Sequence, residues 1–215
     1  MSKKDYIANI ENAERRFFDA KVERRQEGEG ESAIEIIEGT AVRFNVVTDL
    51  GWMKETVLPG AFDDVMNDDI RCLFNHDPNM ILARCKEGKG TLRLWVDEVG
   101  LHYSYATPDR SYAKDLEDAI RAGDVDQSSY AFRVGEVNWE FAQSNEDVDV
   151  RKIVKFSRLY DVSPVTYPAS QDTSVAKRSF EALEAEKKEE EKRKEHTTDS
   201  FDVFDAQYLF NLNSQ

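Results

Sequence analysis

The segment Gly123–Val134 constrains the fold of this chain most strongly, because two structural periods meet in it. Before it, apolar residues from Tyr112 to Ile120 recur at the spacing of one helix face. Gly123 then supplies the residue that favours the left-handed conformation at a helix end. After it, apolar residues from Tyr130 to Val134 alternate with others, which is the period of a strand. The sequence therefore predicts that a helix ends and a strand begins here.

Two adjacent serines open this predicted strand. Because side chains alternate between the faces of a strand, Ser128 shares a face with Tyr130 and Phe132. Ser129 points the opposite way and has Ala131 as its neighbour, so a substrate can reach it. The plain alternative is a strand that happens to begin with two small polar residues. The segment by itself favours that alternative, since a short local motif is weak support for a function.

Most of the chain repeats this strand pattern, with glycines and prolines between the segments. We expect a β-rich α+β fold with an antiparallel sheet, closed or sandwich-like, and few helices. Short helices are expected over residues 5–18, 59–66 and 111–122, and alternation from residue 17 predicts a first strand. The other expected strands span residues 34–47, 52–58, 69–78, 80–84, 91–96, 101–106, 128–134, 137–141 and 151–162.

The last 39 residues differ in composition from the rest. Residues 177–196 are rich in lysine and glutamate and have almost no apolar face, which predicts an exposed helix or a partly disordered segment. Apolar residues return in 201–210, as is typical of a docking segment. We therefore divide the chain into an N-terminal extension, residues 1–16, a folded domain, residues 17–176, and a charged tail, residues 177–215.

Composition excludes several classes of protein. The net charge of −14 disfavours a nucleic-acid ligand, because an acidic surface repels phosphates. No apolar run approaches the ~20 residues that cross a bilayer, and the first residues lack the apolar block of a secretory signal. We expect no membrane association. Cys72 and Cys85 are too few for a disulfide framework and are expected to be reduced, structural thiols.

The motifs of several catalytic classes are also missing from the sequence. It contains no zinc-ligand spacing and no glycine-rich phosphate loop, so we expect neither a metal nor a cofactor. The spacing disfavours a thiol nucleophile, because Cys72 and His76 lie ~13 Å apart along an extended strand, beyond hydrogen-bond distance. What remains is a serine activated by an imidazole that a carboxylate orients.

His76 and Asp161 are the candidates that complete such a site with Ser129. His76 stands at a strand end, where the bond between Asp77 and Pro78 enforces a turn. Asp161 stands in an apolar strand, where a buried carboxylate needs a partner. The alternative, in which Asp161 points outward or caps a turn, is about equally favoured. The other histidines, His102 and His196, are expected to face solvent or to lie in the tail.

The order of the motifs adds a resemblance that covers residues 17–176. In sequence they are Ala-Val-Arg-Phe-Asn, Leu-Pro-Gly-Ala-Phe, Asn-His-Asp-Pro, Asp-Glu-Val-Gly-Leu, Ser-Ser-Tyr-Ala-Phe and Asp-Val-Ser-Pro-Val-Thr-Tyr-Pro-Ala. The chain thereby resembles the prohead (capsid maturation) proteases of tailed bacteriophages, which are serine peptidases similar to the herpesvirus assemblins. The resemblance implies an antiparallel β-barrel with surrounding helices and a charged helical C-terminal tail.

Carried over to this sequence, the resemblance implies that Ser129 is the nucleophile, His76 the base and Asp161 the orienting carboxylate. The family often has glutamate at the position of Asp161. The implied substrates are scaffolding protein or the scaffold-like segment of the major capsid protein, inside the immature prohead in the host cytoplasm. The resemblance also implies self-cleavage, which we expect in the tail after Lys177, and suggests a homodimer. For the oxyanion donor, an amide near Arg151 or Arg158 is a guess.

Two other interpretations stay open at this point. One is a non-catalytic capsid assembly or scaffold protein that keeps the protease fold. The other is a host peptidase of prophage origin, which differs in genetic context and not in chemistry.

Overall fold

The structure is a computed structural model of the whole chain. It describes residues 13–18, 22–30, 33–144 and 147–167, together with seven positions between 181 and 192. The chain divides into two compact units, residues 1–173 and 174–215. The described positions of the second unit have helical backbone and exposed side chains. Most of the tail, and of the extension before residue 13, lies outside the described residues, so the helical tail and the domain limits stay predictions.

The strands of the first unit form two sheets. The larger has eight strands, with the order β1-β11-β12-β6-β7-β8 and with β4 and β5 attached through β12. The smaller has the order β2-β3-β10-β9. Among the described residues of this unit there is one helix, α2 (Ser111–Ala122), which ends at Gly123 in the left-handed conformation. The strands are β1 (Glu14–Phe18), β2 (Val22–Glu27), β3 (Ile34–Arg43), β4 (Thr48–Asp49), β5 (Lys54–Val57), β6 (Ile70–Leu73), β7 (Ile81–Lys86), β8 (Lys89–Gly90), β9 (Leu92–Val96), β10 (Gly100–Ala106), β11 (Gln127–Glu140) and β12 (Val150–Val165).

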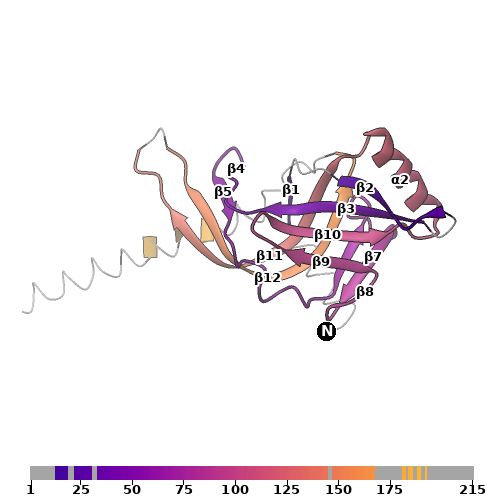
Figure 1. Cartoon of the computed structure of the whole chain (residues 1–215). Coiled ribbons are helices and arrows are strands. Elements are labelled where there is room, and N and C mark those ends of the chain that lie inside the picture. Colours follow the sequence, from indigo (N-terminus) through magenta and orange to yellow (C-terminus); the bar gives the residue numbers. More distant parts are fainter. Residues whose placement is uncertain are drawn as a thin grey trace, which may run out of the picture. The chain divides into compact units, whose positions relative to one another are not determined.

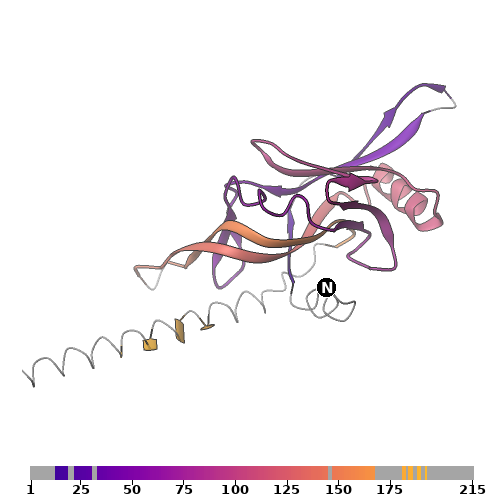
Figure 2. The same ribbon diagram turned by 90° about the horizontal axis from the view of Figure 1, so that it is seen from below.

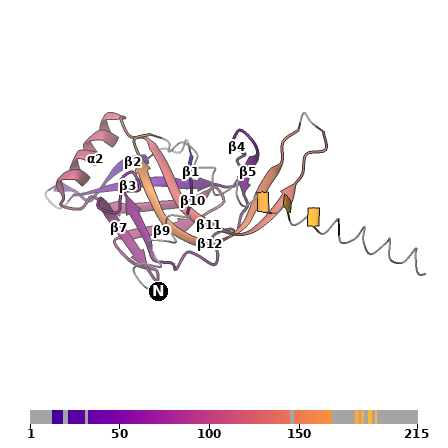
Figure 3. The same ribbon diagram turned by 180° about the vertical axis from the view of Figure 1, so that it is seen from behind.

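The longest strands of the first unit, β11 and β12, form an antiparallel pair. It carries residues of the core at one end, and at the other it extends away from the body on the side opposite α2 (Figures 1 and 3). The sequence predicted two strands, 128–134 and 137–141, where the structure has β11 alone. Register shifts around Val134 and Glu136 explain the difference, because bulges interrupt the alternation without ending the strand.

Both sheets contribute to a single apolar core. Leu101 and Tyr103 of the smaller sheet are buried in one cluster with Phe132, Phe156 and Val162 of the larger. Figure 2 shows β11 and β12 as a layer of their own in the same body. Phe156 packs against the Phe132 ring at a centroid distance of 4.9 Å, edge to face. The apolar faces of the two sheets are therefore covered by each other, as in a sandwich.

The prediction of a β-rich α+β fold is confirmed, but that of a closed antiparallel barrel with surrounding helices is wrong for the described residues. Among the strands that the structure describes, no hydrogen-bonded ladder joins the two sheets. One edge of β12 also pairs in parallel, with β5 at Val150–Ile153 and with β6 at Asp161 and Val162. Face-to-face packing already buries the apolar side chains, so the sheet need not close to cover them.

The helix predicted over residues 5–18 is wrong for its last part, because residues 14–18 form β1. β1 pairs in antiparallel fashion with β11, and Phe17 stands opposite Ser129. Glu14 and Arg16 are both buried and hydrogen-bonded to each other. Residues two apart share a face on a strand but not on a helix, so this contact favours the strand.

Gly39 shows how closely the smaller sheet approaches the core. β3 continues through Gly39 and places it opposite Tyr103. A β-carbon at position 39 would lie 2.6 Å from the ring and hydroxyl of Tyr103. The glycine therefore leaves room for a fully buried tyrosine.

We expect Gly39→Ala to destabilise the protein by about 1–3 kcal/mol, the usual penalty for overpacking a core. The added methyl group must displace Tyr103, whose hydroxyl hydrogen-bonds Ser128 at 2.8 Å. Urea unfolding followed by tyrosine fluorescence measures the change. An unfolding midpoint equal to that of the wild type would contradict the close approach.

Candidate active site

The two serines of β11 face opposite sides of the larger sheet. Ser128 contacts the hydroxyl of Tyr103 inside the core. Ser129 lies on the other face, where its hydroxyl is 2.6 Å from Nε2 of His76. The structure therefore confirms the prediction that Ser128 and Ser129 lie on opposite faces of the strand.

The structure brings Ser129, His76 and Asp161 together, although they are far apart in the sequence. His76 follows the end of β6, and Asp161 lies on β12 beside the strand of Ser129. Nδ1 of His76 is 2.5 Å from Oδ1 of Asp161. The three side chains form one continuous chain of hydrogen bonds from carboxylate to imidazole to hydroxyl, the arrangement of a catalytic triad.

A tight turn after β6 holds the imidazole in place. Asn75 and His76 both have the left-handed backbone conformation, with φ of 55° and 58°. This conformation is uncommon for residues other than glycine and needs support from its surroundings. The amide of Asn75 donates to the carbonyl of Pro164 at 3.1 Å, and the amide of Thr166 donates to Oδ1 of Asn75 at 2.9 Å. These bonds fasten the turn to the end of β12.

Ser163 supports the carboxylate and was missed by the sequence analysis. Its hydroxyl donates to Oδ1 of Asp161 at 2.8 Å, the same oxygen that faces His76. Ser163 is fully buried and stands opposite Ser129 in the ladder. Since Ser163 is two residues from Asp161 on one strand, their shared face was a signal that could have found it.

The surroundings of the triad disfavour the other nucleophile considered. Cys72 lies fully buried on β6, and burial together with the nearby charge of Asp161 raises the pKa of its thiol well above the usual value. A thiol held protonated is a poor nucleophile. Both Cys72 and Cys85 are free and buried. Among the described residues, no group of three or more histidine, cysteine or acidic side chains is arranged to hold a metal ion.

The first strand covers the nucleophile. The expectation that a substrate can reach Ser129 is wrong for this arrangement, because Ser129 has no exposed surface and its hydroxyl lies 2.9 Å from the carbonyl oxygen of Arg16 on β1. The side chains of His76 and Asp161 are 7% and 6% exposed. A hydroxyl has one proton, so Ser129 cannot donate to Arg16 and to His76 at the same time.

Beside this contact lies a buried cluster of four charged side chains, Glu14, Arg16, Glu55 and Arg151, all at most 3% exposed. Nε of Arg16 is 2.9 Å from Oε1 of Glu55. Nη2 of Arg151 is 2.6 Å from Oε2 of Glu14, and Nε of Arg151 is 2.7 Å from Oε2 of Glu55. Two acids and two bases make the cluster neutral, which offsets the cost of burying the charges.

The cluster shifts the titration of Glu14. Burial raises the pKa of its carboxyl, but the charges and hydrogen bonds of Arg151 and Arg16 outweigh burial and lower the pKa below the ordinary 4.5. Burial likewise opposes the charge of Arg16, and Glu55 and Glu14 raise the pKa of its guanidinium. Both groups are thus held in their charged forms.

This shift predicts how β1 responds to acid. A carboxyl with a lowered pKa in the folded state stabilises it above pH 4.5, and this contribution is lost as the pH falls below that value. We expect hydrogen-exchange protection factors of the β1 amides to be constant from pH 7 to about 4.5 and to fall below it. In Glu14→Gln we expect lower protection at pH 7. Protection that is independent of the charge at position 14 would contradict this account.

The other candidates lie away from the triad. His102 on β10 faces Thr40 at 3.0 Å and Asp97 at 2.9 Å, and His196 is outside the described residues. Among the described hydrogen bonds, neither Arg151 nor Arg158 contacts the triad, and the latter binds Asp68. The oxyanion donor therefore stays a prediction.

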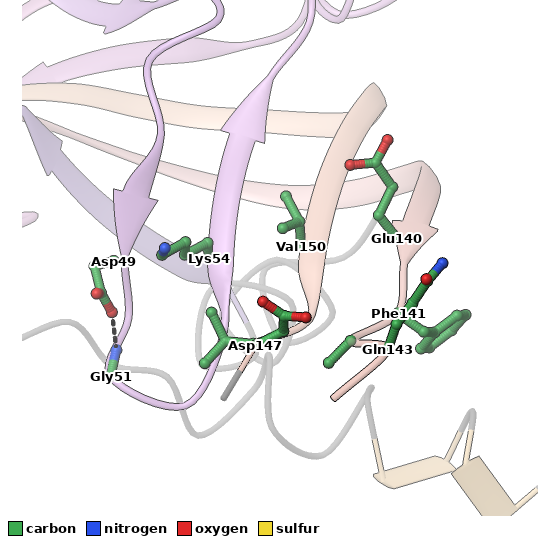
Figure 4. Close-up of a pocket in the computed structure, with 10 residues that line it drawn as sticks. Asp49, Gly51, Lys54, Glu140, Phe141, Gln143, Asp147 and Val150 are labelled. Atoms are coloured by element: carbon green, nitrogen blue, oxygen red, sulfur yellow. Dashed lines mark hydrogen bonds between the residues drawn. The ribbon is translucent and has the colours of Figure 1, made fainter. Parts of the chain in front are cut away.

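A surface hollow is found at the outer end of the β11–β12 pair. Asp49, Lys54, Glu140 and Asp147 line it, and the side chain of Asp49 accepts a hydrogen bond from the amide of Gly51 at 2.7 Å (Figure 4). None of the three predicted catalytic residues lines this hollow. In the described part of the chain, no helix has both the length and the apolarity that crossing a bilayer requires.

Comparison with known proteins identifies a family and a phage protease of similar structure. Residues 20–188 match the family described as caudovirus prohead serine protease. The capsid assembly protease of bacteriophage T4 is similar in structure, with 16% sequence identity and a TM-score of 0.40, over 72% of this chain and 99% of that one. The search of curated proteins found no match.

Proposed function

Because the chain belongs to the family of caudovirus prohead serine proteases, we propose that it is a serine endopeptidase whose catalytic residues are Ser129, His76 and Asp161. The single observation that carries this assignment is the hydrogen-bond chain from Asp161 through His76 to Ser129, with distances of 2.5 and 2.6 Å. Geometry of this kind activates a hydroxyl that is otherwise a weak nucleophile.

The mechanism follows from these contacts. His76, with its proton on Nδ1 held by Asp161, takes the proton of Ser129 through Nε2 while the hydroxyl oxygen attacks a peptide carbonyl. The tetrahedral intermediate needs donors for its oxyanion, such as main-chain amides. His76 then gives the proton to the leaving amine, and water releases the acyl group from Ser129 by the reverse sequence.

The substrates proposed are the scaffolding protein or the scaffold-like segment of the major capsid protein. The family name, prohead protease, supports this class, because a prohead is built from these proteins. The site of action would be the immature prohead in the host cytoplasm. Self-cleavage after Lys177 and a homodimer belong to the same proposal.

Co-expression with the capsid protein of the same phage tests the function. We expect shortened capsid or scaffold products in intact-mass spectra when the wild-type chain is present. Full-length products in its presence, with incorporation of the chain into proheads, would instead favour a non-catalytic assembly protein. An N-terminal sequence read at each new end gives the cleavage position.

Ser163→Ala tests the support of the carboxylate. Since a hydrogen bond to a charged group contributes about 1.5–3 kcal/mol, we expect kcat to fall about tenfold with little change in KM. Ser163→Thr keeps the hydroxyl and is expected to retain more activity. A change in KM alone, or equal loss in both variants, would contradict an orienting role.

A further inference from the structure

β1 lies on β11 in the way that a bound peptide lies on a sheet edge. It is five residues long, it runs antiparallel to β11, and it stands at the outer edge of the larger sheet. Its register places Arg16 opposite Tyr130 and Phe17 opposite Ser129. Peptide substrates commonly bind by adding such a strand, with main-chain hydrogen bonds for affinity and side-chain pockets for specificity.

The carbonyl group of Arg16 lies beside the proposed nucleophile. Its oxygen accepts a hydrogen bond from the hydroxyl of Ser129 at 2.9 Å. The hydroxyl of Ser129 thus contacts the peptide group that joins Arg16 to Phe17. A strand so placed also competes with His76 for the one proton of Ser129.

The side chains of β1 occupy separate sites whose walls belong to other strands. Arg16 reaches Glu55 on β5, and Glu14 reaches Arg151 on β12. Ala13, the residue before β1, packs in a small buried cluster with Ala131 and Tyr160.

Two walls of the charged site also contact each other directly. Glu55 and Arg151 bind each other through Oε2 and Nε at 2.7 Å. Both are buried, and neither is on β1.

We infer that β1 occupies the place of a substrate strand, and that Glu55 and Arg151 select peptides with an arginine at the position of Arg16 and an acidic residue two positions before it. The inference rests on the proposed peptidase function. Cleavage would break the peptide bond after that arginine. The acyl carbon bonds to Ser129, the proton passes through His76 to the leaving amine, and water then hydrolyses the ester.

The charges of the cluster fit a site that selects a peptide sequence better than a contact that only stabilises the fold. Replacing a buried ion-pair cluster by packed apolar side chains is often neutral or stabilising. What charges add is discrimination, since a peptide with the reversed order would place arginine against Arg151 and an acid against Glu55. β1 is then a built-in competitor that a substrate must displace.

Peptide binding tests this inference. The chain Ser129→Ala with Arg16→Glu keeps all 215 residues, cannot cut, and holds β1 less firmly. The probes are a fluorescent peptide with the sequence of residues 11–20 and a peptide of the same composition in which Glu14 and Arg16 are exchanged. By fluorescence anisotropy, we expect the first to bind at least about tenfold more tightly, the loss of one good ion pair in a desolvated site.

A charge exchange in the protein is the matched control. In the chain Ser129→Ala with Arg16→Ala, which leaves position 16 uncharged, Glu55→Arg with Arg151→Glu is expected to reverse the preference between the peptides. Arg16→Ala replaces Arg16→Glu should the latter fail to fold, as judged by near-ultraviolet circular dichroism. Equal affinity for the two peptides, or no binding of either at millimolar concentration, would overturn the inference.

Cleavage separates this inference from the proposed function. With Ser129 restored, we expect the first peptide to be cut between the residues matching Arg16 and Phe17. Selective binding without any cleavage would support the specificity site and contradict the peptidase. Cleavage of the capsid protein with no selectivity between the peptides would overturn the specificity site and support the peptidase.

Discussion

Replacing Ser129 by alanine is expected to lower kcat by about 10⁶-fold, the size of effect seen when a triad serine is removed. The reason is that the hydroxyl is the proposed attacking group, and His76 has no other hydroxyl within hydrogen-bond distance among the described contacts. Loss of capsid-protein processing, followed by mass spectrometry, measures the effect. The fold should persist, since the change removes one small buried atom.

Ser128→Ala is the matched control, because it is the same change one residue earlier. Ser128 faces the core and contacts Tyr103, so its loss leaves a buried hydroxyl without that partner. We expect about 1–3 kcal/mol of destabilisation and retained cleavage well below the unfolding midpoint. Cleavage that survives Ser129→Ala but not Ser128→Ala would reject the assignment of the nucleophile.

Local rules made the three site residues candidates, and the resemblance to the prohead proteases implied their roles. Strand alternation separated Ser129 from Ser128, and proline after Asp77 placed His76 at the end of a strand. The burial cost of a carboxylate in an apolar strand pointed to a partner for Asp161. Each argument needs only neighbours in the chain, which is why each could be made before the structure. The same rules could have found Ser163.

The arrangement of the strands depended on contacts that local rules do not see. The parallel pairing of β12 with β5 and β6 joins segments about 90 residues apart, and no turn motif announces it. β1 was predicted as a helix because residues 5–18 have helical spacing. Its partners Glu55 and Arg151 lie 39 and 135 residues from Arg16 and decide the outcome through tertiary contacts.

The buried charges explain why one substitution outside the triad is expected to have a large effect. Glu55 is hydrogen-bonded to both Arg16 and Arg151 and is 3% exposed. Its removal leaves two buried guanidinium groups with Glu14 as the single acid of the cluster. An ion cluster that is neutral when complete then carries an uncompensated positive charge in a place that water does not reach.

We therefore expect Glu55→Ala to lower the free energy of unfolding by about 3–5 kcal/mol, the penalty for breaking a buried ion pair by removing one partner. Urea unfolding measures it, with Lys155→Ala as the control. That change breaks an exposed pair with Asp64 and should leave the midpoint unchanged, because solvent already screens both charges. Glu55→Gln keeps the shape but not the charge, so a loss close to that of alanine assigns the effect to charge. An unfolding midpoint that stays unchanged in Glu55→Ala, Glu55→Gln and Lys155→Ala alike would contradict a buried cluster. Only exposed groups can lose a charge without a loss of stability.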